Sequence, residues 1–222
     1  MPSPTPLLVG DLLQKNAKTY PRRVAAWMGG DSLTFAELDE SADRLAQALR
    51  AQGVGHGDRI VAWADTCLEV LPLFVALAKL GAVFAPLNAR LGTSEAAVIV
   101  KMAQPRMLVA DADHLQGAIE IAGELGIERV GSLSAPDRES NVMDLRPNQL
   151  APCPEPIDEP ALAETDPHVI FFTSGSTGAP KGVILSHRAN YLRTYQGVFL
   201  AEEERSVCMF PLFHMAAFTL AL

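Results

Sequence analysis

Residues 171–183 read FFTSGSTGAPKGV, and this stretch is the most informative in the chain. The apolar run that ends at Phe172 predicts a strand, and the segment after it consists almost wholly of glycine and hydroxyl residues. Glycines let backbone N–H groups approach a ligand closely, and serine and threonine add O–H donors. Lys181 adds a positive charge, so we expect this loop to bind a polyphosphate. The expected loop donors are Thr173, Ser174, Gly175, Ser176, Thr177 and Gly178.

The spacing excludes two other glycine-rich motifs. In a Walker loop, lysine comes directly after the last glycine and is followed by Ser or Thr. Here two residues separate the last glycine of the loop from Lys181, and Gly182 follows the lysine. A nucleophile elbow has glycine two positions before its serine, which neither Ser174 nor Ser176 has. A flexible Ser/Gly linker is the remaining alternative, and the apolar runs on both sides of the loop argue against it.

Composition and charge narrow the class of protein. The chain has 222 residues, of which 49% are hydrophobic, enough for a substantial core. A net charge of −8 argues against a nucleic-acid-binding surface. The three cysteines, Cys67, Cys153 and Cys208, are widely spaced and form no metal-ligand pattern. Their odd number and wide spacing indicate a reduced, cytoplasmic protein. No signal peptide and no transmembrane run is found.

Hydrophobic periodicity predicts alternating helices and strands. The predicted helices are 7–18, 35–52, 66–80, 93–103, 112–125 and 187–199. The predicted strands are 25–28, 33–35, 59–64, 82–86, 106–110, 127–130, 168–172, 183–185 and 206–209. Alternation over residues 58–131 implies βαβ units, so the fold class is α/β with mostly parallel sheets flanked by helices.

Helix starts and turns carry their own signals. Thr34 with Glu37, and Thr66 with Glu69, form capping boxes, and Pro72 should kink its helix or delay its start. The fourth helix is expected to begin at a cap formed by Thr93 or Ser94. The glycine-rich residues 53–57 follow a helix and precede a strand, so they predict a turn rather than a dinucleotide-binding loop.

The chain divides into three parts. Residues 1–131 form a first α/β subdomain, and residues 132–167 form a proline-rich acidic connection with few regular elements. Residues 168–222 begin a second α/β subdomain that contains the phosphate loop and is truncated at its C-terminus. Two histidines have two interpretations each. His187, beside the cap Ser186, is a structural residue or a nucleotide contact, and His214 is a core residue or a ligand contact at a strand end.

The loop motif resembles the signature of the AMP-forming adenylating enzymes, which include acyl-CoA synthetases, luciferases and adenylation domains of peptide synthetases. Three further stretches are similar to segments of the same superfamily and occur in the same order. They are LTFAEL at 33–38, LGAVFAPLNARL at 80–91 and PLFH at 211–214. The second is most similar to the acyl-CoA synthetases. The resemblance therefore implies the N-terminal portion of a fatty-acid–CoA ligase-like enzyme, an incomplete N-terminal domain of that adenylate-forming fold.

The resemblance implies a role for particular residues. The loop from Thr173 to Lys181 would hold the β- and γ-phosphates of ATP, with Lys181 as a catalytic residue and Thr173 as a Mg²⁺ contact. Ala217 occupies a position where many members have glycine, so the resemblance does not fix the shape of the pocket floor or the choice of substrate. The residues that would border the carboxylic acid are His214, Met215, Ala216 and Ala217.

The implied reaction has two steps. A carboxylate attacks the α-phosphorus of ATP and expels pyrophosphate, and the thiol of coenzyme A then attacks the acyl-adenylate. The alternatives are an adenylation domain that loads a carrier-protein thiol and a truncated, non-catalytic nucleotide-binding module. The later motifs of the superfamily are not found in the sequence, so we expect the chain alone to be inactive. Its apolar C-terminal residues 207–222 would favour self-association or a homodimer.

Overall fold

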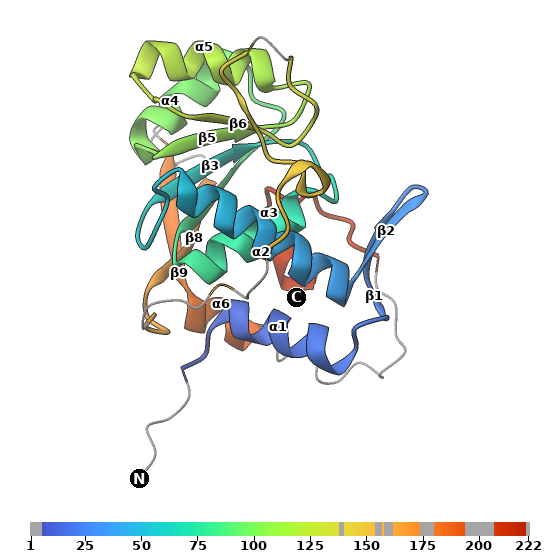
Figure 1. Ribbon diagram of the computed structural model, residues 1–222. Coiled ribbons are helices and arrows are strands. Elements are labelled where there is room, and N and C mark those ends of the chain that lie inside the picture. Colours follow the sequence, from blue (N-terminus) through green and yellow to red (C-terminus); the bar gives the residue numbers. More distant parts are fainter. Residues whose placement is uncertain are drawn as a thin grey trace.

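The computed structural model describes residues 6–137, 140–153, 157, 162–173, 180–193 and 207–220. A seven-stranded sheet lies at the centre of the described residues (Figure 1). Its strands are β3 (Arg59–Trp63), β4 (Val83–Leu87), β5 (Met107–Ala110), β6 (Val130–Ser132), β7 (Met143–Asp144), β8 (Pro167–Thr173) and β9 (Lys181–Ser186). Their order is β7-β6-β5-β3-β4-β8-β9, and all neighbours are parallel except β8 and β9. The predicted α/β fold with a mostly parallel sheet is confirmed.

Helices cover both faces of this sheet, as Figure 1 shows. They are α1 (Val9–Thr19), α2 (Phe35–Ala51) and α3 (Val70–Leu80) on one face and α4 (Thr93–Ala103) and α5 (Leu115–Leu125) on the other. Successive residues of a strand point to opposite faces, so Ile60 and Ala62 pack with α1–α3 while Val61 and Trp63 pack with α4 and α5. Burial on both faces explains why the central strands are continuously apolar.

The start of α2 agrees closely with the prediction. The hairpin of β1 (Val24–Met28) and β2 (Asp31–Thr34) leads directly into the helix. Thr34 Oγ1 accepts the Glu37 N–H at 3.2 Å, and Glu37 Oε2 accepts the Thr34 N–H at 2.8 Å. This reciprocal capping box fixes the first turn of the helix, and the apolar stripe of α2 then packs onto α1 and α3.

Two predicted helix caps are wrong. Helix α3 begins at Val70, and its N-cap Glu69 makes no side-chain cap hydrogen bond. Pro72 delays the start because it is tolerated only in the first turn, where its missing N–H needs no partner. Thr66 Oγ1 instead accepts the N–H of Leu212 at 3.2 Å. The N-cap of α4 is Gly92, not Thr93 or Ser94, and its N–H donates to Glu95 at 3.1 Å.

The largest differences between the predicted and the observed strands concern residues 127–130 and 206–209. The predicted strand 127–130 begins later, at Val130, because the Ile127 N–H still closes the end of α5 by donating to Ala122 O at 2.9 Å. Residues 207–209 do not form the predicted strand. The side chains of Val207 and Met209 alternate along the chain as in a strand, but they are 77% and 80% exposed and do not pack in a core.

The second half of the chain contributes both edge strands of the sheet, β7 and β9. The connection 132–167 contributes only β7 and a 3₁₀ turn, Pro147–Gln149, among its described residues. Strand β8 pairs with β4, so the sheet continues across residue 168, and the division into two subdomains stays a prediction. The last elements are α6 (His187–Arg193) and α7 (Met215–Leu220). The rest of the predicted helix 187–199 lies outside the described residues.

Two glycines that end helices provide a matched test of packing. Gly81 and Gly126 end α3 and α5 with φ angles of 63° and 68°. A Cβ at Gly81 would lie 2.4 Å from Leu162 Cδ2, whereas a Cβ at Gly126 would meet nothing within 4 Å. We expect Gly126→Ala to cost about 1 kcal/mol of unfolding free energy, for the left-handed backbone alone. Gly81→Ala should cost at least ~1 kcal/mol more, because it adds the overlap. Urea unfolding of both variants checks this, and equal losses would contradict it.

Candidate functional site

The two described ends of the predicted phosphate loop lie side by side. Thr173 is the last residue of β8 and Lys181 is the first of β9, and the two are cross-strand partners. Both side chains are exposed. The hairpin therefore places a hydroxyl and a cation at the base of one loop. The residues Ser174, Gly175, Ser176, Thr177 and Gly178 lie outside the described residues, and their role stays a prediction.

Packing of β8 and β9 fixes the positions of Thr173 and Lys181, the two described ends of the loop. Val169 and Phe171 of β8 are buried in the core with α1–α3. Gly182, the residue after the lysine, lies so close to β8 that a Cβ there would be 3.0 Å from Ile170 Cγ2. Because β8 is parallel to β4, the loop leaves the sheet at its carboxyl edge. In open α/β sheets, ligands bind at this edge.

A second group of polar side chains lies at the same edge, after the neighbouring strands. Asp111 Oδ2 accepts the Asp65 N–H at 2.7 Å, and its Oδ1 lies 2.6 Å from His114 Nδ1. The other ring nitrogen of His114 lies 2.8 Å from the carbonyl oxygen of Ala89. The sequence analysis missed this group. Its signal is that Asp65 and Asp111 each follow closely after a buried strand.

The segment that carries His214 is bound to this edge through Leu212, whose N–H donates to Thr66. His214 is exposed, so its interpretation as a core histidine is wrong. Met215 is also exposed, whereas Ala217 is fully buried in the core with α1–α3. Ala216 is half-buried between them. That these residues border a carboxylic acid stays a prediction.

An apolar cavity of about 380 Å³ adjoins this segment. It lies between α1, the β1–β2 hairpin, α3 and the segment that begins at Val207. No charged side chain lines it within the described part of the chain. Its lining includes Trp27, Met28, Leu71, Phe74 and Leu212. A cavity of this size and polarity suits the hydrophobic body of a small ligand.

Comparison with known proteins identifies the family. Residues 13–222 match the family of AMP-binding enzymes. The chain belongs to this family. Its curated relatives include a feruloyl-CoA synthase of Amycolatopsis sp, 34% identical over 207 residues, which are 91% of this chain and 39% of that protein. The crotonobetaine/carnitine–CoA ligase of Salmonella typhi is 32% identical over 192 residues, which are 82% of this chain and 36% of the ligase.

Solved structures agree with this family. The ATP-bound MatB of Rhodopseudomonas palustris superposes with a TM-score of 0.80 at 27% identity. The match covers 98% of this chain and 42% of MatB. The N-terminal domain of these adenylate-forming enzymes is therefore the fold of this chain. The chain spans less than half the length of the curated relatives named here.

The chain contains a buried histidine pair that the sequence analysis did not predict. The rings of His168 on β8 and His187 on α6 stack with centroids 4.6 Å apart, and both side chains are fully buried. His168 Nδ1 lies 2.9 Å from Asn190 Nδ2, and His187 Nδ1 accepts the Val9 N–H at 3.5 Å. The structural interpretation of His187 is thus confirmed. Ser186 Oγ accepts a backbone N–H three residues on, as a helix cap does.

Burial sets the protonation of this pair. It lowers the pKa of His168 well below its ordinary value and lowers the pKa of His187 to about 4. At neutral pH both rings are therefore uncharged in the folded protein. In the unfolded chain, histidine has a pKa of about 6.5 and takes up a proton more readily. The unfolded state therefore binds more protons between pH 6.5 and about 4, and stability falls as the pH falls through this window.

We expect the free energy of unfolding to drop by at least ~1 kcal/mol between pH 7 and pH 5 because of this pair. Urea titrations at both pH values measure the drop. His168→Leu should reduce the difference in unfolding free energy between the two pH values, because it removes one of the two buried rings. A drop that is the same in the parent and in His168→Leu would contradict this prediction.

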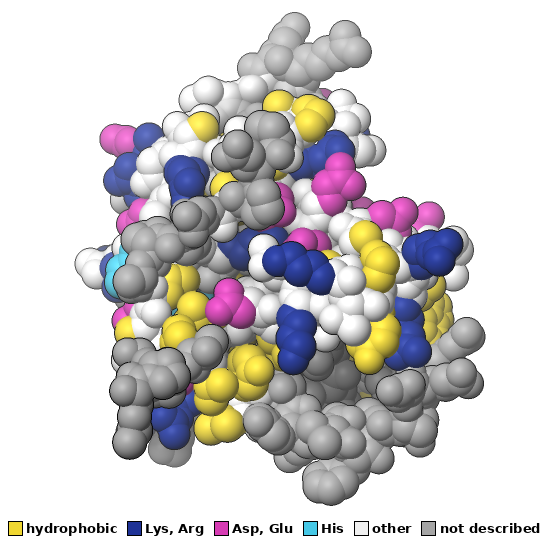
Figure 2. Space-filling model, turned by 60° about the horizontal axis from the view of Figure 1, so that its bottom comes forward, with side chains coloured by type: hydrophobic (Ala, Val, Ile, Leu, Met, Phe, Trp, Pro, Cys, Tyr) yellow, Lys and Arg dark blue, Asp and Glu magenta, His cyan; other side chains and the backbone are white. Residues whose placement is uncertain are grey.

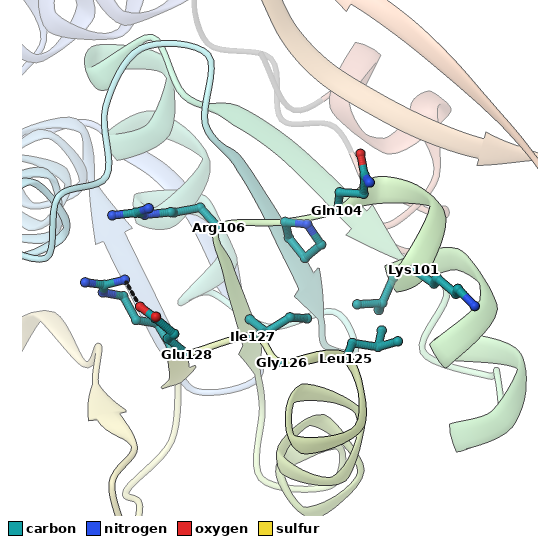
Figure 3. A pocket seen from close by; sticks show the side chains of 10 residues that line it. Lys101, Gln104, Arg106, Leu125, Gly126, Ile127 and Glu128 are labelled. Atoms are coloured by element: carbon teal, nitrogen blue, oxygen red, sulfur yellow. Dashed lines mark hydrogen bonds and ion pairs between the residues drawn. The ribbon is translucent and has the colours of Figure 1, made fainter.

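A separate pocket of about 500 Å³ lies at the opposite edge of the sheet (Figure 3). Arg106 and Arg129 line it and directly precede β5 and β6, so the pocket lies at the amino ends of these strands. Lys101 also lines it, near the end of α4. Helices α4 and α5 both end here, and cations near helix C-termini are electrostatically favourable. The basic side chains are therefore explained without a ligand.

Figure 2 shows acidic and basic side chains interspersed over one face of the molecule. Among the described residues, no group of three or more His, Cys, Asp or Glu side chains could hold a metal ion. Within the same residues no helix is long and apolar enough to cross a membrane.

Proposed function

We propose that this chain supplies the ATP-phosphate site for activation of a carboxylic acid. The acid would form an acyl-adenylate with release of pyrophosphate, and coenzyme A would then accept the acyl group as a thioester. The curated relatives named above are CoA ligases, which supports this class of reaction. The observation that carries the proposal is the pairing of Thr173 with Lys181 at the base of the loop in a chain of the AMP-binding family.

The chemistry of the loop ends fits a polyphosphate. Negative charge grows on the pyrophosphate as it leaves, and a preplaced ammonium group at Lys181 would stabilise that charge without reorganisation. The hydroxyl oxygen of Thr173 is a hard ligand of the kind that Mg²⁺ prefers. Bound Mg²⁺ would neutralise further phosphate charge. The donors proposed for the loop between them would orient the phosphates.

The substrate class follows from the cavity beside the segment that carries His214. Its lining is apolar and without charge in the described part of the chain, which supports a carboxylic acid with a hydrophobic body, such as a fatty or an arylalkenoic acid. The residues proposed to border this acid are His214, Met215, Ala216 and Ala217. The choice between coenzyme A and a carrier-protein thiol concerns the second step alone.

We also propose that the protein is cytoplasmic and that the chain associates with itself. The three cysteines all lie among the described residues and form no disulfide bond, which supports a reducing, cytoplasmic location. Val207, Met209 and Phe210 expose large apolar side chains, which supports self-association of the 222-residue chain. Light scattering at increasing concentration tests the second point, and a monomer throughout would contradict it.

ATP–pyrophosphate exchange tests the proposed function. The assay is run on an active enzyme that carries this sequence, over a panel of fatty, aromatic and short polar carboxylic acids. We expect exchange that depends on an acid and is fastest with hydrophobic acids. Absence of acid-dependent exchange across the panel would contradict the proposal. The assay reports only the first step, so it does not depend on which thiol accepts the acyl group.

A further inference from the structure

A continuous series of hydrogen bonds crosses the carboxyl edge of the sheet. It begins at the Ala89 carbonyl, 2.8 Å from His114 Nε2, and passes through the ring to Asp111 Oδ1 at 2.6 Å. Asp111 Oδ2 then accepts the Asp65 N–H at 2.7 Å. The first and last of these three bonds cross from one strand end to another, since Ala89 follows β4, Asp111 and His114 follow β5, and Asp65 follows β3.

The series continues to the segment that carries His214. Asp65 Oδ1 accepts the Thr66 N–H at 2.7 Å, and Thr66 Oγ1 accepts the Leu212 N–H at 3.2 Å. Five hydrogen bonds thus connect a turn near residue 89 with a segment more than a hundred residues later in the chain. Both ends of this network lie at the edge of the sheet where the phosphate loop leaves it.

Asp111 and His114 are the rigid centre of this network. Their side chains are only 16% and 15% exposed, so hydrogen bonds between them are little weakened by water. The His114 ring also packs against Trp63, with ring centroids 4.8 Å apart. Gly117 lies close beneath Trp63, because a Cβ there would be 2.9 Å from Trp63 Cζ3. The ring of His114 therefore has little freedom to turn.

A purely local role does not account for these contacts. Asp111 also accepts the backbone N–H of His114 at 3.0 Å, which is an ordinary bond at the start of a helix. That bond uses only Oδ1. A helix-start residue needs neither the bond from Oδ2 to the Asp65 N–H nor a histidine ring that reaches the Ala89 carbonyl.

We propose that Asp111 and His114 are positioning residues that hold two segments in place at the substrate edge. One segment is the turn 88–91 and the other is 211–217, which carries His214. The network sets where the second segment lies relative to the sheet, and so sets the shape of the site that receives the carboxylic acid. That last step rests on the proposed function, whereas the coupling between Asp111 and Leu212 does not.

Hydrogen–deuterium exchange of the 222-residue chain, resolved to single amides by NMR, tests the coupling. Thr66→Val removes the acceptor of the Leu212 N–H and should speed exchange at Leu212 at least fivefold. Asp111→Ala should speed exchange at Asp65 directly and at Leu212 by a similar factor. Asp113→Ala removes an exposed carboxylate in the same turn and should change neither amide. Amides of the central strand β3 report whether each variant keeps its fold.

The results separate a positioning role from a local one. Faster exchange at Asp65 with an unchanged Leu212 amide in Asp111→Ala would overturn the proposal. If Asp111→Ala does not fold, His114→Phe replaces it, because phenylalanine keeps the ring contact with Trp63 and loses both ring hydrogen bonds. His114→Phe should also speed exchange at Leu212 at least threefold, and an unchanged rate would overturn the proposal.

A kinetic measurement tests the link to the substrate. In an active enzyme that carries this sequence, Asp111→Asn keeps one oxygen acceptor but offers an N–H₂ group where a second acceptor is needed. We expect a KM for the carboxylic acid raised about tenfold, with the KM for ATP unchanged. Equal effects on both KM values would overturn the link. An inactive parent would contradict the proposed function while the exchange result still decides the coupling.

Discussion

Replacing Lys181 with alanine should lower the rate of ATP–pyrophosphate exchange at least tenfold in an active enzyme that carries this sequence. The lysine stands opposite Thr173 at the base of the loop, where its charge would stabilise the leaving pyrophosphate. Removing one preorganised donor to a developing negative charge typically costs a factor of about 10²–10³ in rate. The loss should appear in kcat as well as in the KM for ATP, because the charge grows during the reaction.

A second lysine provides the control for this prediction. Lys101 lines the pocket at the opposite edge of the sheet (Figure 3), so Lys101→Ala should leave the exchange rate within about twofold. An unchanged rate in Lys181→Ala would refute the assignment of the phosphate site. A similar loss in both variants would point to a general effect of charge.

Replacing Lys79 with alanine should have the largest effect on stability. Lys79 Nζ lies 2.6 Å from Asp39 Oδ1 and 2.5 Å from Asp43 Oδ1, and its side chain is only 6% exposed. This triad joins α2 to α3. Burial already raises the pKa of Asp43, so its carboxylate depends on the lysine for compensation. Removing one partner from a buried ion pair costs about 3–5 kcal/mol.

Urea unfolding at pH 7 measures this loss. Lys18→Ala is the matched control, because Lys18 is exposed and its amine donates to Gln14, four residues earlier on α1. We expect a change within about 0.5 kcal/mol for this control. A loss below ~1 kcal/mol in Lys79→Ala would contradict the account of the triad. So small a loss is typical of an ion pair whose carboxylates are in contact with water.

The sequence predicted the elements whose signals are local. The capping box of Thr34 and Glu37 and the glycine at position 81 mark helix ends by hydrogen bonds and backbone angles within a few residues. Continuous apolar runs such as that of β4 identify strands that are buried on both faces. The predicted cap at Thr66 is wrong because its hydroxyl bonds to Leu212, a partner 146 residues away.

Of the candidate site, the sequence predicted only the loop motif and the residues within it. The loop motif pointed to Thr173 and Lys181, and their cross-strand pairing explains how the chain keeps them together. The Asp111–His114 network and the stack of His168 on His187 could not be predicted, because each depends on which strands become neighbours. No periodic pattern within either segment encodes that order.

The most direct test of the central claim is binding of ATP to the 222-residue chain itself, measured by equilibrium dialysis with Mg²⁺ present. The account predicts saturable binding of ATP that pyrophosphate displaces. It also predicts that Lys181→Ala weakens this binding at least tenfold while Lys101→Ala does not. Absence of binding, or binding that neither pyrophosphate nor Lys181→Ala affects, would contradict the claim that the loop between β8 and β9 is the phosphate site.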